Sequence, residues 1–255
     1  KVATEVFAWA EKSNPFSYVG CHWLDVVAHY MGVKPRALFA TGEKNILRNW
    51  DRYSKRVAEL QGTDTSRFLR TEPIDAWDSI NVNITYDNGM RGDFNNTWIN
   101  PAEFEGEVNQ EIEVYGVLGR GFVDQQYRGF RETITGDGTR TRNPTFGGRI
   151  RGETTELYGY GKASIVAGLL AIARRKFDGA DDEKLADSYP AAASQRDVVM
   201  VLEAAAAVAE RNYSRFRDNG CTPVTARLTD DSIELIDPLE ESAETLYRRE
   251  PVRES

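Results

Sequence analysis

The alternation of apolar and polar positions predicts a β-hairpin near the middle of the first half of the chain. Apolar residues occupy every second position from 80 to 86, and Asn and Thr lie between them, which is typical of a strand with one buried face. Asp87-Asn88-Gly89 follows, a sequence that readily adopts the positive φ angles of a tight turn. Residues 90–98 are therefore expected to return as the partner strand.

Other periodic segments predict further strands and helices. Residues 110–118, 121–127 and 129–134 are rich in Val, Ile, Tyr and Phe and are separated by glycines, which indicates an antiparallel meander. Apolar periodicity predicts helices over residues 160–177 and from about 194 to just before 220. The predicted fold class is α+β, with a largely antiparallel open β-sheet and helices packed on one face.

The composition shifts near residue 229, and this shift predicts the domain boundary. Residues 230–255 are acidic and polar with few apolar anchors, so we expect a loosely ordered tail after one α+β domain over residues 1–229. The glycines of residues 116–121 resemble a phosphate-binding loop, but they lie between two strand-like runs and open no helix. They predict a hairpin turn, because a dinucleotide fingerprint requires a strand, a loop and a helix in succession.

Charge and cysteine content exclude several classes of protein. The formal net charge of −8 argues against a nucleic-acid binder, which normally presents a basic face. No run of residues is apolar and long enough to predict a membrane span, and no signal peptide is recognisable at the start. Two cysteines, Cys21 and Cys221, are too few for a disulfide framework. These features favour a cytoplasmic protein.

The stretch around His22 is the best candidate for chemistry. His22 opens an apolar helix that ends at Gly32, a predicted C-cap, and histidine is well suited to proton transfer near neutral pH. His22, Asp25 and His29 share one helical face, so a metal site is a weaker alternative. Two further alternatives are that His22 only caps or packs, and that Cys21 acts as a nucleophile.

The same stretch resembles the second domain of the Gfo/Idh/MocA oxidoreductases. The likeness rests on Gly20, His22 and Asp25 at the start of the helix and on the hairpin with Asn88-Gly89. It continues through four later segments and covers roughly residues 14–218. These segments are Ile112–Gly116, Arg128-Gly129, Asn143–Phe146 and Gly159–Ile165.

The resemblance implies a hydride transfer between NAD or NADP and a hydroxyl of a sugar, cyclitol or sugar acid. It also implies that an upstream dinucleotide domain, which supplies a Lys, binds the cofactor, and that this chain supplies an Asp and the catalytic His22. Four residues before His22, where many members have the Asp, this chain has Tyr18. A phenol can still hydrogen-bond a substrate hydroxyl.

Four further polar residues complete the expected substrate site. Asp25 is placed to orient the His22 ring or to cap the helix. Arg128 and Asn143 border strands and loops and are candidates to contact substrate carboxylate or hydroxyl groups, with simple surface placement as the alternative. The resemblance implies that a tyrosine near the start of the predicted helix at residue 160 faces the sugar, and Tyr160 is the better candidate.

The sequence therefore predicts the C-terminal substrate-binding domain of an NAD(P)-dependent dehydrogenase. The alternative is a non-catalytic binding or oligomerisation module with the same fold. The expected partners are a small sugar or polyol and a second copy of the chain, with no nucleic acid and no membrane. Helices on one face of the sheet would leave an open face, and an apolar open face predicts a homo-oligomer through that face.

Overall fold

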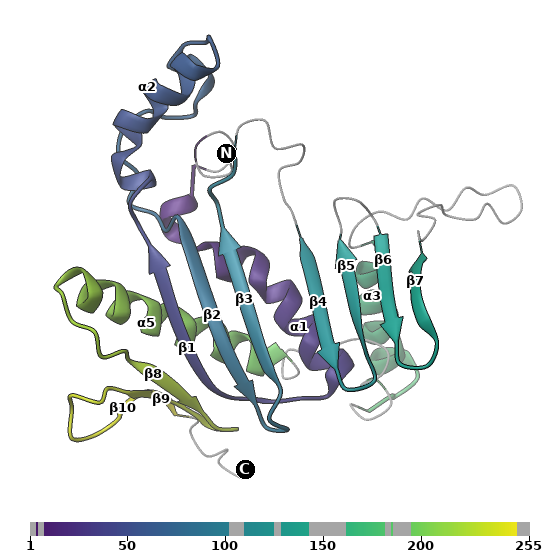
Figure 1. Cartoon of the computed structure of the whole chain (residues 1–255). Helices are drawn as coiled ribbons and strands as arrows, with labels where there is room; N and C mark the ends of the chain where they lie inside the picture. Colours follow the sequence, from purple (N-terminus) through teal and green to yellow (C-terminus); the bar gives the residue numbers. More distant parts are fainter. Residues whose placement is uncertain are drawn as a thin grey trace, which may run out of the picture. The chain divides into compact units, whose positions relative to one another are not determined.

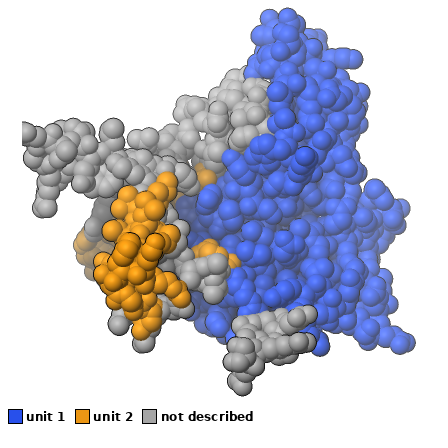
Figure 2. Space-filling view, turned by 180° about the vertical axis from the view of Figure 1, so that it is seen from behind, with its two compact units in different colours: residues 1–105, 196–255 blue, residues 106–195 orange. Residues whose placement is uncertain are grey.

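The structure is a computed structural model that describes residues 4, 8–101, 110–124, 129–142, 162–181, 185 and 195–248. The chain divides into two compact units, which Figure 2 shows in different colours. Unit 1 contains residues 1–105 and 196–255, and unit 2 contains residues 106–195. The fold class is α+β, as predicted, and the strands pair in antiparallel fashion within each unit.

Unit 1 is built on a six-stranded sheet with the strand order β10-β9-β8-β1-β2-β3. Its strands are β1 (Pro35–Glu43), β2 (Ser79–Tyr86), β3 (Arg91–Thr97), β8 (Thr225–Leu228), β9 (Ser232–Ile236) and β10 (Glu244–Arg248). The predicted hairpin is confirmed: β2 pairs with β3, and Gly89 between them has a φ of 84°. Strand β1 lies between β2 and β8, so the sheet joins residues from both ends of the chain.

The two faces of this sheet differ in chemistry. Ile80, Val82 and Ile84 of β2 point to the buried face, which the helices α1 (Cys21–Met31) and α5 (Arg196–Arg217) cover (Figure 1). Helix α5 packs a stripe of small and branched residues against the sheet, including Val201, Ala204, Ala205 and Val208. Helices on one face were predicted from the sequence, and the structure has this arrangement in unit 1.

The opposite face of β2 and β3 is polar. Its exposed residues are Asn81, Asn83 and Thr85 of β2 and Arg91, Asp93, Asn95 and Thr97 of β3. An apolar open face was expected as the basis of an oligomer, and this expectation is wrong for these two strands. The period-two pattern already placed the Asn and Thr residues together, because side chains alternate between the faces of a strand.

Residues 230–248 form part of the sheet, which corrects the loosely ordered tail expected from residue 230. Ile233 and Leu235 of β9 are each 2% exposed, and β9 pairs with both β8 and β10. Most acidic residues of this segment lie outside β9, while alternate positions of β9 are apolar and buried. The overall acidic composition concealed this short alternation.

The connection between β1 and β2 has a small core of its own. It contains the 3₁₀ turns η4 (Leu47–Asn49) and η5 (Thr65–Arg67) and the helix α2 (Trp50–Leu60). Its buried residues pack together with Ala10 of the N-terminal segment and Trp98, which follows β3. We call this set the aromatic cluster: Ala10, Leu47, Trp50, Ala58, Phe68, Ile74, Ala76 and Trp98. Lys44 ties the segment to α5 through an ion pair with Glu210 at 2.8 Å.

Unit 2 contains a four-stranded antiparallel sheet in the order β4-β5-β6-β7. Its strands are β4 (Glu111–Gly116), β5 (Gly119–Asp124), β6 (Gly129–Ile134) and β7 (Gly138–Arg142), and the unit also contains helix α3 (Lys162–Phe177). Gly116 pairs with Gly119 across a tight turn, so the glycines of this region form the predicted hairpin turn. Strand β7 carries Thr and Arg residues and shows no apolar alternation, so the sequence pattern did not predict it.

Candidate functional site

The helix that carries His22 begins earlier than the sequence analysis placed it. A π-helix, η3 (Phe16–Gly20), leads directly into α1, because Gly20 and Cys21 both have right-handed helical backbone angles. Asn14 caps this continuous helix: its Oδ1 accepts a hydrogen bond from the backbone N–H of Ser17 at 2.8 Å. Pro15 follows at the first helical position, a favoured place for proline. The Asn-Pro pair was the missed sequence signal.

One face of this helix packs tightly on the sheet. Phe16 and Leu24 are buried and Gly20 lies between them, and the ring of Phe16 meets that of Phe94 on β3 at 5.9 Å between centroids. A Cβ atom on Gly20 would lie 2.4 Å from Cδ2 of Phe16 and 3.2 Å from Oδ1 of Asn96. Glycine is therefore required here by close approach, and the contact fixes the rotation of the helix about its axis.

That rotation points His22 away from the sheet. His22 and His29 are exposed and Asp25 is half-buried, so the three share the outward face that their spacing predicts. Nevertheless, the described residues contain no group of three His, Cys, Asp or Glu side chains arranged to hold a metal ion. The helix ends as predicted, because Gly32 adopts a φ of 61° and its N–H donates to the carbonyl of Ala28 at 3.0 Å.

Tyr18 lies four residues before His22 and is half-buried. It packs against the aromatic cluster, and its ring lies 5.1 Å from that of Trp9, measured between centroids. Trp9 precedes the short 3₁₀ turn η2 (Ala10–Lys12). The sequence analysis did not single out Trp9, because no local periodicity links it to Tyr18. The aromatic cluster thus contacts the candidate site through Tyr18.

Cys21 does not have the properties of a nucleophile. Burial raises the pKa of its thiol above the ordinary value, which lowers the fraction of reactive thiolate at neutral pH. Its Sγ lies 3.7 Å from the carbonyl oxygen of Tyr18, a weak hydrogen bond back to the preceding turn. The nucleophile alternative for Cys21 is therefore disfavoured by the surroundings of the thiol.

The remaining expected substrate residues lie outside the part of the chain that the structure describes. These are Arg128, Asn143 and Tyr160, and their placement beside His22 stays a prediction. Of the residues predicted for the site, the structure brings together Tyr18, His22 and Asp25 on one helix.

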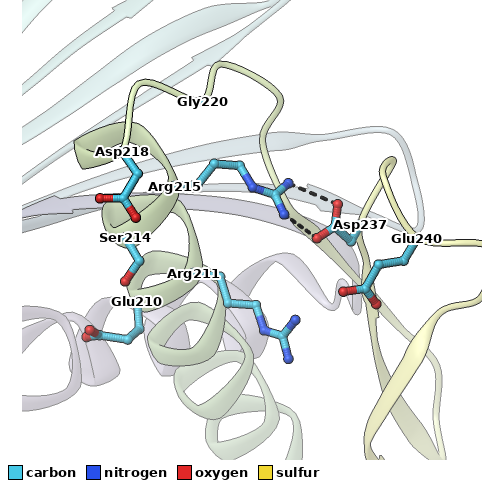
Figure 3. Close-up of a pocket in the computed structure, with 8 residues that line it drawn as sticks. All are labelled: Glu210, Arg211, Ser214, Arg215, Asp218, Gly220, Asp237 and Glu240. Atoms are coloured by element: carbon cyan, nitrogen blue, oxygen red, sulfur yellow. Dashed lines mark hydrogen bonds and ion pairs between the residues drawn. The ribbon is translucent and has the colours of Figure 1, made fainter.

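A separate pocket of about 450 Å³ lies at the end of α5, away from the His22 helix (Figure 3). It is lined by Glu210, Arg211, Ser214, Arg215, Asp218, Gly220, Asp237 and Glu240. Arg215 reaches across it to Asp237, with Nη1 and Oδ1 2.9 Å apart. This ion pair holds the pKa of Asp237 down at about 2, helped by a hydrogen bond from the backbone N–H of Leu239. The charges of Arg215 and Asp237 thus compensate each other.

The sequence profile of the GFO/IDH/MocA C-terminal domain matches residues 3–120, a range that contains Tyr18, His22 and the β2-β3 hairpin. Residues 3–120 are therefore similar to a Gfo/Idh/MocA C-terminal domain. This match agrees with the expected Gfo/Idh/MocA resemblance.

Solved structures with a similar fold are distant in sequence. An inositol dehydrogenase homolog from Azotobacter vinelandii, complexed with NADH and myo-inositol, is 15% identical with a TM-score of 0.49; the match covers 76% of this chain and 47% of that one. An aldose-aldose oxidoreductase from Caulobacter crescentus, complexed with glycerol, is 15% identical with a TM-score of 0.48; the match covers 86% of this chain and 50% of that one. A levoglucosan dehydrogenase in complex with NADH and levoglucosan is 17% identical with a TM-score of 0.44; the match covers 77% of this chain and 49% of that one.

The chain thus spans about half the length of these structures. No curated protein matches its sequence. Within the described part of the chain, no helix is both long and apolar enough to cross a bilayer.

Proposed function

We propose that this chain is the substrate-binding and proton-transferring part of a dehydrogenase that acts on a hydroxyl of a sugar, cyclitol or sugar acid. The observation that supports this proposal is the placement of His22. His22 is exposed on a helix of the segment that matches the Gfo/Idh/MocA family, and close packing at Gly20 fixes the side of the helix from which its side chain projects. An exposed imidazole on a fixed helix is suited to general base catalysis.

In the proposed reaction, an imidazole nitrogen of His22 accepts the hydroxyl proton of the substrate. The Tyr18 hydroxyl holds a neighbouring substrate hydroxyl, and Asp25 orients the imidazole from the same helical face. A nicotinamide cofactor supplies the hydride acceptor when it is bound.

The glycines at 116 and 119 close a hairpin between antiparallel strands, so this turn lacks the strand-loop-helix context of a dinucleotide-binding loop. We propose that a separate dinucleotide domain binds NAD or NADP.

Replacement of each histidine in turn tests the assignment, in a protein that carries this chain together with the dinucleotide domain. His22→Ala should lower kcat by about 100- to 10,000-fold, the usual contribution of a positioned acid or base. His29→Ala is the matched control, because His29 is also exposed on the same helical face, and its turnover should equal that of the wild type. Unchanged turnover in His22→Ala would contradict the proposal.

The presence of Tyr18 where many members have an Asp favours a second candidate function, a binding module without catalysis. This candidate predicts that sugars or polyols bind while hydride transfer is absent, whether or not His22 is present. Tyr18→Asp separates the two candidates, since it should change turnover by the dehydrogenase and leave a pure binding module inactive.

We also propose that the chain forms a homo-oligomer through the open face of the six-stranded sheet. Because the exposed residues of β2 and β3 are polar, this contact would be made by hydrogen bonds of Asn and Thr side chains. Sedimentation at micromolar concentration tests it. A dimer that Asn83→Ala weakens supports the interface, and a monomer contradicts it.

A further inference from the structure

Trp9 and Tyr18 present an aromatic surface beside the candidate site. Their ring centroids are 5.1 Å apart and their planes are inclined by 60°. Trp9 is 38% exposed although it is large and apolar, while Tyr18 is half-buried and rests on the aromatic cluster. The Tyr18 ring thus packs on the aromatic cluster, whereas the Trp9 ring remains partly open to solvent.

Helix geometry places this surface close to His22. Tyr18 and His22 are four residues apart, so they lie on the same side of the helix, about one turn from each other. Gly20 lies midway between them and faces the sheet, and residues two positions away from it point to roughly the opposite side. Tyr18, with Trp9 packed against it, therefore lies on the side of the helix from which His22 projects.

Aromatic rings of this kind bind groups that are apolar on one face and polar at the edge. Trp and Tyr offer a large, rigid contact area with a polar atom at the rim, and small-molecule sites combine such walls with a few polar groups that fix orientation. A ring-shaped polyol matches this arrangement, because it carries C–H groups on a rigid face and hydroxyls around its edge. An open-chain polyol has no fixed apolar face and loses rotational freedom on binding.

We propose that the Trp9–Tyr18 pair packs against the C–H face of a ring-shaped polyol and thereby selects cyclic over open-chain substrates. The proposal rests on the proposed function of His22, because the imidazole then meets a hydroxyl at the edge of the same ring. Trp9 is a specificity-determining residue in this arrangement and takes no part in proton transfer.

Calorimetric titration of the chain with two polyols of equal hydroxyl number tests the proposal. The probes are myo-inositol, which is a ring, and sorbitol, which is an open chain. We expect myo-inositol to bind more tightly, and Trp9→Ala to weaken its binding about 3- to 10-fold, as expected for the loss of one aromatic contact. Trp9→Phe, which keeps a ring, should restore most of the affinity, while the affinity for sorbitol should be the same in all variants.

Tyr30→Ala is the matched control, because Tyr30 is 78% exposed near the other end of α1. Its affinities should equal those of the wild type, and thermal unfolding shows whether Trp9→Ala is folded. The proposal is overturned if neither polyol binds, if both bind equally, or if folded Trp9→Ala and Trp9→Phe bind myo-inositol as the wild type does.

The same variants distinguish this inference from the proposed function. In one outcome, Trp9→Ala selectively loses myo-inositol binding, while neither the wild type nor any variant transfers hydride when joined to the dinucleotide domain. This outcome would contradict the proposed function alone. Hydride transfer that depends on His22 but shows the same preference between cyclic and open-chain polyols in Trp9→Ala would contradict the aromatic surface alone.

Discussion

Asn212 and Val224 exchange two hydrogen bonds inside unit 1: the Asn212 Nδ2 donates to the Val224 carbonyl at 3.0 Å, and the Val224 N–H donates to the Asn212 Oδ1 at 2.7 Å. The same Nδ2 also donates to the carbonyl of Ala40 on β1 at 2.9 Å. Asn212 is fully buried on α5. A single amide thus joins the helix, the central strand and the segment that leads into β8.

Asn212→Ala should lower the free energy of unfolding by about 3 kcal/mol, because it leaves buried backbone groups without partners. Urea unfolding measures the change. Asn95→Ala on the exposed face of β3 is the control and should alter stability by no more than about 0.5 kcal/mol. An equally small loss in Asn212→Ala would mean that the buried amide does not hold these elements together.

The connection between β1 and β2 depends on a different buried polar side chain. The carboxylate of Asp78 accepts hydrogen bonds from the backbone N–H groups of Asn45, Ile46 and Leu47 at 2.6, 2.6 and 2.8 Å. These are N–H groups at the start of the η4 turn, and a carboxylate from a distant part of the sequence satisfies all three. Asp78 is itself 4% exposed.

Asp78→Ala should destabilise the protein by about 2 to 4 kcal/mol, since three buried donors lose a charged acceptor. Asp78→Asn should fall between Ala and the wild type, because an amide keeps one acceptor oxygen. Hydrogen exchange at Asn45, Ile46 and Leu47 checks the cause and should accelerate in both variants. If exchange there is unchanged while stability falls, the loss has another origin.

The β2-β3 hairpin and helices α1 and α5 of unit 1 could be predicted, because their periodic segments are long enough to be unambiguous. The hairpin over residues 79–97 combines strict alternation with an Asn-Gly turn, and α5 repeats apolar residues over several turns. Strand β9 is too short for its alternation to stand out in an acidic segment, and β7 carries Thr and Arg at most of its positions. Pairing with neighbouring strands stabilises both, and pairing is not a property of the local sequence.

The candidate site shows the same limit. His22 and Tyr18 could be found because their spacing on a helix is local. The start of that helix at Asn14 was also available in the sequence, as an Asn-Pro pair. The contact between Trp9 and Tyr18, by contrast, depends on how the chain before the helix folds over the aromatic cluster, so it required the structure.

The Arg215–Asp237 ion pair makes stability depend on acid pH. The Asp237 carboxylate, 4% exposed in its side chain, has a folded-state pKa of about 2, below the ordinary value of 3.8, chiefly because of the hydrogen bonds from Arg215. A carboxyl whose pKa is lower in the folded state stabilises the protein above its unfolded pKa and loses this contribution as pH falls toward the folded value. The affected window is therefore roughly pH 4 to 2.

Chemical unfolding between pH 6 and pH 2 tests this linkage in the wild type and in Asp237→Asn. The wild type should be the more stable of the two at pH 6, and the difference between them should shrink as the pH falls below about 4. Asp218→Asn serves as the control, because Asp218 is exposed and its partner Arg217 is exposed as well. A difference that stays constant over this range would show that Asp237 does not titrate with folding.

Gly20 is the position where stability and the candidate site are most directly coupled. Gly20→Ala would place a Cβ 2.4 Å from Cδ2 of Phe16, and Phe16 is 1% exposed and cannot move into solvent. Overpacking of this kind costs about 1 to 3 kcal/mol, and the better helix propensity of alanine offsets up to about 1 kcal/mol of it. A net loss of about 1 to 2 kcal/mol in thermal or urea unfolding is expected.

The double variant Gly20→Ala with Phe16→Leu tests this explanation, because the smaller leucine side chain makes room for the added methyl group. The double variant should lose less stability than the sum of the two single variants, which is the signature of residues in direct contact. Residue 20 lies between Tyr18 and His22 on the helix, so Gly20→Ala should also shift the imidazole and lower turnover. The double variant should recover part of the lost turnover. Strictly additive losses would indicate that the helix does not depend on close packing at Gly20.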